Sequence, residues 1–187
     1  SITATDDTLG KHLIQEIKNY PEANYSAFFG RHLGNYYLVL TFPVVWSYEL
    51  FESYAAAKRN FNDRIPHEAD FEPYAGRKYY AGNTVGGYYA ARLAILEKLV
   101  KMRRQASVLA LRFVTDEYYM PLGVWVVREA TRNAMENRPI EFPSKELMLA
   151  YAKDLAKEKF NINLDVLLQE SKLVKNIKTQ RKLSSFI

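Results

Sequence analysis

Apolar residues recur every three or four positions in several parts of the chain, and this spacing predicts helices. The longest such segment is 84–104, where an apolar stripe includes Tyr89 and Leu96. A further segment begins after Ser144, a residue type that favours the N-cap position. The predicted helices cover 6–19, 47–58, 84–104, 121–137, 144–160 and 164–177.

Two other segments, 35–45 and 106–114, are rich in β-branched, leucine and aromatic residues and therefore predict buried strands. The stretch GVWVV at 123–127 is compatible with either a strand or a helix. Proline and glycine residues within 61–83 predict a long loop, and its length favours a functional or ligand-covering role. The predicted fold class is α+β, with about five or six helices around a small β-sheet.

Length and composition limit the class of protein. A chain of 187 residues that is 48% hydrophobic can form one domain with a sizeable core. Since cysteine is absent, disulfides, thiolate zinc sites and thiol nucleophiles are excluded. The sequence contains neither a membrane-spanning apolar run nor a signal-peptide pattern, so we expect a cytoplasmic protein without a membrane partner. The first residue is Ser, which suggests a piece of a longer chain.

The positive charge is confined to the C-terminal end. The chain has 26 Lys and Arg residues, 21 Asp and Glu residues and a net charge of +5. Five of the cations and none of the acids follow Glu170, so the first 170 residues carry no net charge. This balance excludes a uniformly basic coat for nucleic acid. We predict a single globular domain at 1–170 and a flexible basic tail at 171–187.

The tail ends in QRKLSSFI, in which Gln180, Leu183, Phe186 and Ile187 have the spacing of a short recognition peptide. This pattern resembles the PIP box, with which many replication and repair proteins bind the sliding clamp PCNA. A tight helical turn would place the apolar residues on one side, where they could enter an apolar pocket. The alternative is a frayed helix end whose Leu183 and Phe186 pack against the body.

The body contains candidates for phosphate or nucleic-acid contact. Gly86 and Gly87 begin the longest predicted helix, where exposed backbone N–H groups can bind an anion, although no Walker A or dinucleotide fingerprint is present. The alternative role of these glycines is close helix packing. Arg92 lies beside the apolar stripe and needs a partner there, which could be Glu97, another buried acid or a ligand phosphate.

A second set of candidates lies on the helix predicted at 121–137. Trp125, Arg128 and Arg132 have the spacing i, i+3, i+7, which suits a phosphate backbone or a stacked base. The alternative is a core tryptophan with an internal Glu129–Arg132 ion pair. The cations that end the longest helix, including Arg103 and Arg104, are interpreted as a solvated helix end.

Signals for catalysis and metal binding are weak. His67, Glu68 and Asp70 lie close together, but their spacing matches no recognised metal site, so no metal is predicted. Neither a G-x-S-x-G motif nor a Ser-His-Asp order is visible. Catalytic residues therefore remain unidentified, and no cofactor is evident.

Several stretches together resemble a known family. They are NYYLVLTFPVVWSYELFE at 35–52, GGYYAARLAILEKL at 86–99, RRQASVLALRFVTDEYYMPLGVWVVREATRNAM at 103–135 and the terminal QRKLSSFI. They resemble the C-terminal part of the archaeal Nre ("novel repair") proteins over most of residues 30–187. The resemblance implies a nucleoid-associated DNA-repair factor of archaea that binds PCNA through its terminal motif. Family members are about twice this length and some have a cysteine-rich motif, so it also implies a C-terminal portion or a short version.

Three functions follow as expectations. In the first, the tail tethers the body to the clamp, and the body handles DNA or another phosphate ligand. In the second, the body is a metal-dependent nuclease or nucleotide hydrolase. Arg92 and Arg128 would then stabilise phosphoryl charge beside carboxylates from 68–72. In the third, the chain is a structural module that docks on the rest of a longer protein.

Overall fold

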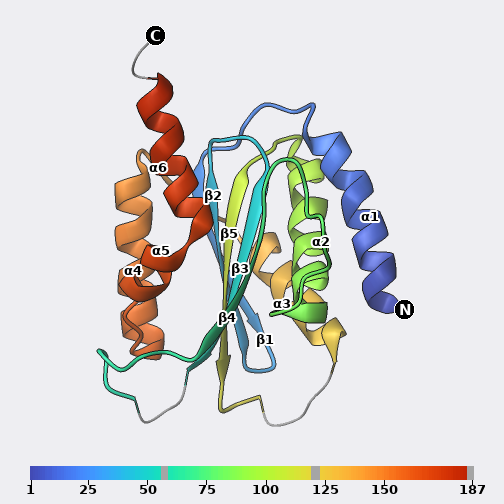
Figure 1. Ribbon diagram of the computed structural model, residues 1–187. Coiled ribbons are helices and arrows are strands. Elements are labelled where there is room, and N and C mark those ends of the chain that lie inside the picture. The colour runs from blue at the N-terminus through green and yellow to red at the C-terminus, as the bar shows by residue number, and fades with distance from the viewer. Residues whose placement is uncertain (56–58, 119–122, 185–187) are drawn as a thin grey trace.

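The computed structural model describes residues 1–55, 59–118 and 123–184, and in this part of the chain a six-stranded sheet lies between two layers of helices (Figure 1). The strands are β1 (Tyr25–His32), β2 (Asn35–Phe42), β3 (Ser47–Ala55), β4 (His67–Glu72), β5 (Ser107–Thr115) and β6 (Ile140–Phe142). The helices are α1 (Ile2–Ile17), α2 (Val85–Met102), α3 (Val124–Glu136), α4 (Lys145–Phe160), α5 (Asp165–Glu170) and α6 (Lys172–Ser184). The predicted α+β class is confirmed.

The strand order is β4-β3-β5-β2-β1-β6. Only the β3–β5 pair is parallel among the strands described, and the other neighbouring pairs are antiparallel. Strand β5 is thus placed in the middle of the sheet, between two strands that come much earlier in the chain. Because helices cover both of its faces, seven of its nine residues are buried, which explains its continuous apolar sequence.

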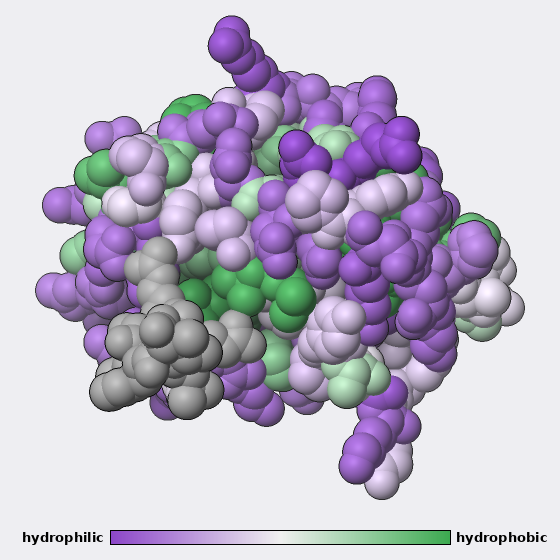
Figure 2. All heavy atoms as spheres, turned by 90° about the horizontal axis from the view of Figure 1, so that it is seen from above, coloured by the Kyte–Doolittle hydropathy of each residue, from purple (hydrophilic) through white to green (hydrophobic). Residues whose placement is uncertain are grey.

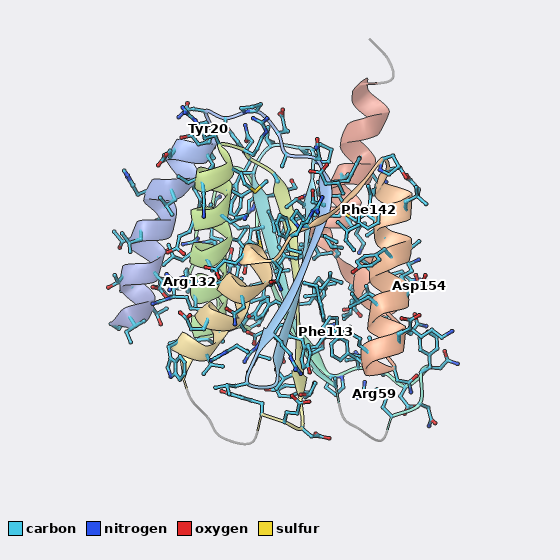
Figure 3. The ribbon with its side chains drawn as sticks, turned by 180° about the vertical axis from the view of Figure 1, so that it is seen from behind. Tyr20, Arg59, Phe113, Arg132, Phe142 and Asp154 are labelled. Carbon is cyan, nitrogen blue, oxygen red and sulfur yellow. The ribbon has the colours of Figure 1, made fainter. Side chains whose placement is uncertain are left out.

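Each face of the sheet has its own apolar core. Helices α1, α2 and α3 cover one face and α4, α5 and α6 cover the other (Figures 1 and 3). The first core contains Trp46, Tyr48, Tyr88 and Leu96, all fully buried. The second core is built from side chains of the opposite face, which include Phe42, Phe51, Leu111, Phe113, Met148 and Leu167.

Two of the predicted elements are wrong. Residues 47–55 form strand β3 rather than the start of a helix over 47–58, because this segment pairs with β5 on one side and β4 on the other. The predicted loop at 61–83 contains strand β4, whose side chains alternate in burial along the sheet edge. Strands β1 and β6 were not predicted. The segment at 123–127 belongs to helix α3 except for Gly123, its N-cap, whereas the predicted helix start at Pro121 lies outside the described residues.

The predicted boundary between body and tail lies between α5 and α6, so the helix predicted at 164–177 is two helices. Leu173, Val174 and Ile177 of α6 are buried in the second core. The buried carboxylate of Glu49 fixes the start of α6, because it accepts hydrogen bonds from the backbone N–H groups of Lys172 (3.0 Å) and Leu173 (3.1 Å). The first half of the basic segment is therefore part of the folded body.

Candidate functional site

A network of buried charges joins α1, α2 and β4 on one face of the sheet. Arg92 is its centre and is only 1% exposed. One terminal nitrogen, Nη2, donates to Asp7 Oδ1 at 2.7 Å, and the other, Nη1, donates to Glu72 Oε2 at 3.0 Å. The Tyr88 hydroxyl donates to the same Glu72 oxygen at 3.0 Å. Gly10 leaves room for the guanidinium, since a Cβ there would lie 3.0 Å from Arg92 Nη2.

The network perturbs the titration of its members. Burial alone would raise the pKa of Asp7, but the hydrogen bonds from Lys11 and Arg92 outweigh it and hold that pKa below its ordinary value. Burial raises the pKa of the Tyr88 hydroxyl far above its usual range, and the neighbouring Glu72 carboxylate raises it further. Arg92 and Asp7 are therefore a charged structural pair at neutral pH.

The other predicted arginines also contact carboxylates. Arg128 donates to both oxygens of Asp6 on α1. Arg132 donates to Glu97 on α2, with Nη2 and Oε1 2.9 Å apart, and to Glu129 on its own helix at 3.1 Å. Each arginine thus has its own acid. They do not converge on one open cleft, and this favours the ion-pair alternative over phosphate contact.

Trp125 lies at the start of α3 and is 47% exposed. Its ring makes an edge contact with His32, with centroids 5.9 Å apart. The indole is therefore a surface side chain rather than the core tryptophan of the alternative interpretation. Its use by a ligand remains a prediction.

The glycines at the start of α2 make close packing contacts. A Cβ on Gly86 would lie 2.7 Å from Val124 Cγ1, and a Cβ on Gly87 would lie 2.4 Å from Glu52 Oε1. Asp70 accepts hydrogen bonds from the backbone N–H groups of Asn83 (3.0 Å) and Thr84 (2.7 Å). The helix start is therefore already next to two of the protein's own carboxylates. A phosphate at Gly86 and Gly87 remains a prediction, and the geometry supports the packing role.

Beneath Gly87 lies a second polar cluster that the sequence did not reveal. Arg112 on β5 donates to Glu52 on β3 at 2.9 Å and to Asn35 on β2 at 2.9 Å. Burial raises the pKa of Glu52, and the charge and hydrogen bond of Arg112 oppose this rise. The cluster joins three neighbouring strands at one end of the sheet. Its members are 60 and 77 residues apart in the chain, so no local motif marks them.

The candidate metal ligands are separated by the fold. His67 Nε2 lies 2.6 Å from Glu170 Oε2, and its Nδ1 lies 2.8 Å from the backbone oxygen of Ile65. Asp70 and Glu72 contact Arg77 and Arg92. Within residues 1–55, 59–118 and 123–184, no group of three or more His, Asp or Glu side chains could hold a metal ion. The nuclease or hydrolase hypothesis gains no support from these contacts.

The terminal motif lies at the far end of α6. The backbone of Gln180 and Leu183 is helical, whereas Phe186 and Ile187 lie outside the described residues. Clamp contact by these four residues remains a prediction. Among the helices described, none is long and apolar enough to cross a membrane.

Two family models match the chain. The model for the C-terminal part of archaeal Nre matches residues 72–186, and the model for its N-terminal part matches residues 1–59. The match thus begins earlier than the resemblance at 30–187 indicated. Strand β5, which belongs to the C-terminal match, lies between β2 and β3, which belong to the N-terminal match, so the two matched segments form one sheet.

Curated proteins give the same result. The chain is 35% identical over its full length to the DNA repair protein NreB of Archaeoglobus fulgidus, of which the match covers 47%. It is 39% identical over 73% of its length to the DNA repair protein NreA of Haloferax volcanii, of which 33% is covered. The chain therefore spans less than half the length of these relatives. No solved structure matches. The chain belongs to the archaeal Nre family.

Proposed function

We propose that this chain is part of a DNA repair factor that binds the sliding clamp PCNA through its C-terminal motif. The names of its relatives, the DNA repair proteins NreA and NreB, support the repair role. The sequence QRKLSSFI supports the choice of partner, because its spacing matches that of clamp-binding peptides.

The observation that carries the proposal is the placement of α6. Its first half is anchored by Leu173, Val174 and Ile177, whereas Figure 1 shows the helix continuing past the end of the sheet. The helical backbone that leads to the motif thus extends beyond the sheet. An anchored helix that ends in an apolar peptide suits helix-type recognition of a groove on another protein.

Binding to the clamp would also compensate for the weak attraction of a neutral body to DNA. A body without net charge has little general attraction to phosphate. Binding to a clamp that encircles DNA raises the effective concentration of the body near DNA, so a weak local contact is sufficient.

The test is a binding measurement between the full chain and purified archaeal PCNA, without DNA. The double variant Leu183→Ala/Phe186→Ala removes both apolar contacts and should weaken binding by roughly 30-fold or more, as expected for central interface residues. The matched control is Ser184→Ala/Ser185→Ala, which alters the intervening positions of the motif and should bind normally.

Thermal unfolding of both variants should match that of the parent chain, because these positions follow the anchored half of α6. Unchanged clamp binding in Leu183→Ala/Phe186→Ala would contradict the proposal. Loss of the fold in that variant would instead show that the motif packs on the body.

A further inference from the structure

The end of the molecule from which α6 projects carries cations of a different kind from those in the body. Lys18, Arg103 and Arg104 lie there at the ends of α1 and α2. Within the described part of the chain, none of these three side chains forms an ion pair with a carboxylate. Figure 2 looks onto this end and shows hydrophilic side chains around an apolar hollow. These cations are therefore available to an anionic partner.

Two of the cations lie over tyrosine rings. Lys18 Nζ is 4.1 Å from the ring centroid of Tyr74, and Arg103 Cζ is 5.7 Å from that of Tyr20. Tyr74 is 47% exposed. We call the surface formed by Lys18, Tyr20, Tyr74, Arg103 and Arg104 the terminal face. It combines cations that form no carboxylate ion pair in the described residues with the exposed ring of Tyr74, and cations beside an aromatic ring are the combination that binds single-stranded nucleic acid.

Hydrogen bonds hold the terminal face in one arrangement. The Gln105 side-chain amide donates to the backbone oxygens of Lys18 (3.3 Å) and Tyr20 (2.8 Å) and so ties the end of α1 to the segment after α2. Lys18 Nζ also donates to the backbone oxygen of Tyr74 at 2.8 Å. The cations and rings are thus positioned before any partner arrives, which lowers the entropic cost of binding.

The terminal face is continuous with the helix that carries the clamp motif. A hollow of about 310 Å³ lies between them, and its wall includes Tyr74 together with Asn176 and Ile177 of α6. Figure 3 shows Tyr20 at the same end of the molecule as the projecting part of α6. A protein held by its C-terminus on a clamp would therefore present this face on the clamp side.

The helix dipoles explain part of the gathering of cations at the ends of α1 and α2, since cations are favoured at helix C-termini. They do not explain why the half-exposed Tyr74 accompanies these cations. Charge and aromatic rings together favour a single strand over a duplex, whose bases are stacked inside, and over an acidic peptide, which needs no rings.

We propose that the terminal face binds single-stranded DNA, with phosphates at Lys18, Arg103 and Arg104 and a base stacked on Tyr74. The choice of DNA as the nucleic acid rests on the proposed function. The positions of the cations and the exposure of Tyr74 are features of the structure itself.

The test is fluorescence anisotropy of a labelled single-stranded DNA oligonucleotide with the full chain, at low salt and without clamp. The charge reversal Lys18→Glu/Arg104→Glu should weaken binding by about tenfold or more. The matched control is Lys157→Glu/Lys159→Glu, which makes the same charge change in the last turn of α4, where both lysines also lie over aromatic rings. The control should retain most of the affinity.

Two further variants separate stacking and charge. Tyr74→Ala should weaken binding by about fivefold or more, whereas Tyr54→Ala, which removes a 63% exposed tyrosine near the other end of β3, should not. Glu22 is exposed, and its backbone forms an isolated β-bridge with that of Gln105 beside the terminal face. Glu22→Lys therefore adds positive charge next to this face and should strengthen binding by about threefold.

The proposal would be overturned if the Lys157→Glu/Lys159→Glu control lost as much affinity for the oligonucleotide as Lys18→Glu/Arg104→Glu. The proposal would also be overturned if a duplex or an acidic peptide bound as tightly as the single strand and Tyr74→Ala did not weaken binding of the single strand. The Leu183→Ala/Phe186→Ala variant should bind the oligonucleotide normally, since no clamp is present. Failure of the clamp proposal is therefore distinguishable from failure of this one.

Discussion

The cations of the body and those of the terminal face differ in what they contact. Arg92, Arg112 and Arg128 each contact a carboxylate from a distant part of the chain, and these ion pairs join separate elements of the body. Lys18 and Arg103 instead contact tyrosine rings at the molecular surface. A buried charge must be paired to be tolerated, so the first group serves the fold. An exposed unpaired charge is free to serve a ligand.

The largest effect should follow from removing the central buried cation. Arg92→Ala leaves Asp7 and Glu72 buried without their partner, so the free energy of unfolding should fall by about 3–5 kcal/mol. Urea-induced unfolding followed by circular dichroism measures this change. If stability fell by no more than it does in an exposed-site variant, the structural role of Arg92 would be wrong.

The pH dependence of stability should report the same network. The pKa of Asp7 in the folded protein lies below its ordinary value of 3.8, so its pairing stabilises the fold above that pH. This contribution is lost as the pH falls through the lowered pKa. The stability difference between the parent chain and Asp7→Asn should therefore be largest near neutral pH and shrink in acid. A difference that stays constant from pH 7 to pH 2 would contradict this assignment.

The smallest effect in this series is expected at Arg132. Its side chain is 36% exposed and its partners Glu97 and Glu129 are similarly accessible. Exposed pairs contribute little, so Arg132→Ala should cost about 0–1 kcal/mol in urea unfolding. A loss as large as that of Arg92→Ala would show that exposure does not separate the two groups of cations.

Local patterns predicted much of the fold. The helical spacing of apolar residues predicts α1, α2 and α4, and runs of β-branched and aromatic residues predict β2 and β5. Ser144 is the N-cap of α4, as predicted. The helix prediction at 47–58 fails because β3 is covered on both faces, so its apolar residues do not alternate as they do in a half-exposed strand. Strand β4 is short and flanked by prolines and glycines, which made its segment look like a loop.

The site was harder to predict because its contacts are long-range. Arg92 lies 85 residues from Asp7, and Arg128 lies 122 residues from Asp6. No spacing rule links residues that far apart. The sequence alone indicates only a solvated helix end at Arg103 and Arg104 and does not connect these residues with Lys18 and Tyr74. Tyr74 and Lys18 are 56 residues apart, and only the fold brings them together.

The most direct test of the central claim is the salt dependence of DNA binding. The logarithm of the affinity should fall linearly with the logarithm of salt concentration, with a slope of about −0.7 per phosphate contact for a single strand. Lys18→Ala/Arg104→Ala should make this slope shallower by about one to one and a half, whereas Arg132→Ala should leave it unchanged. If Arg132→Ala reduced the slope as much as the terminal-face variant, the distinction between paired and unpaired cations would be contradicted.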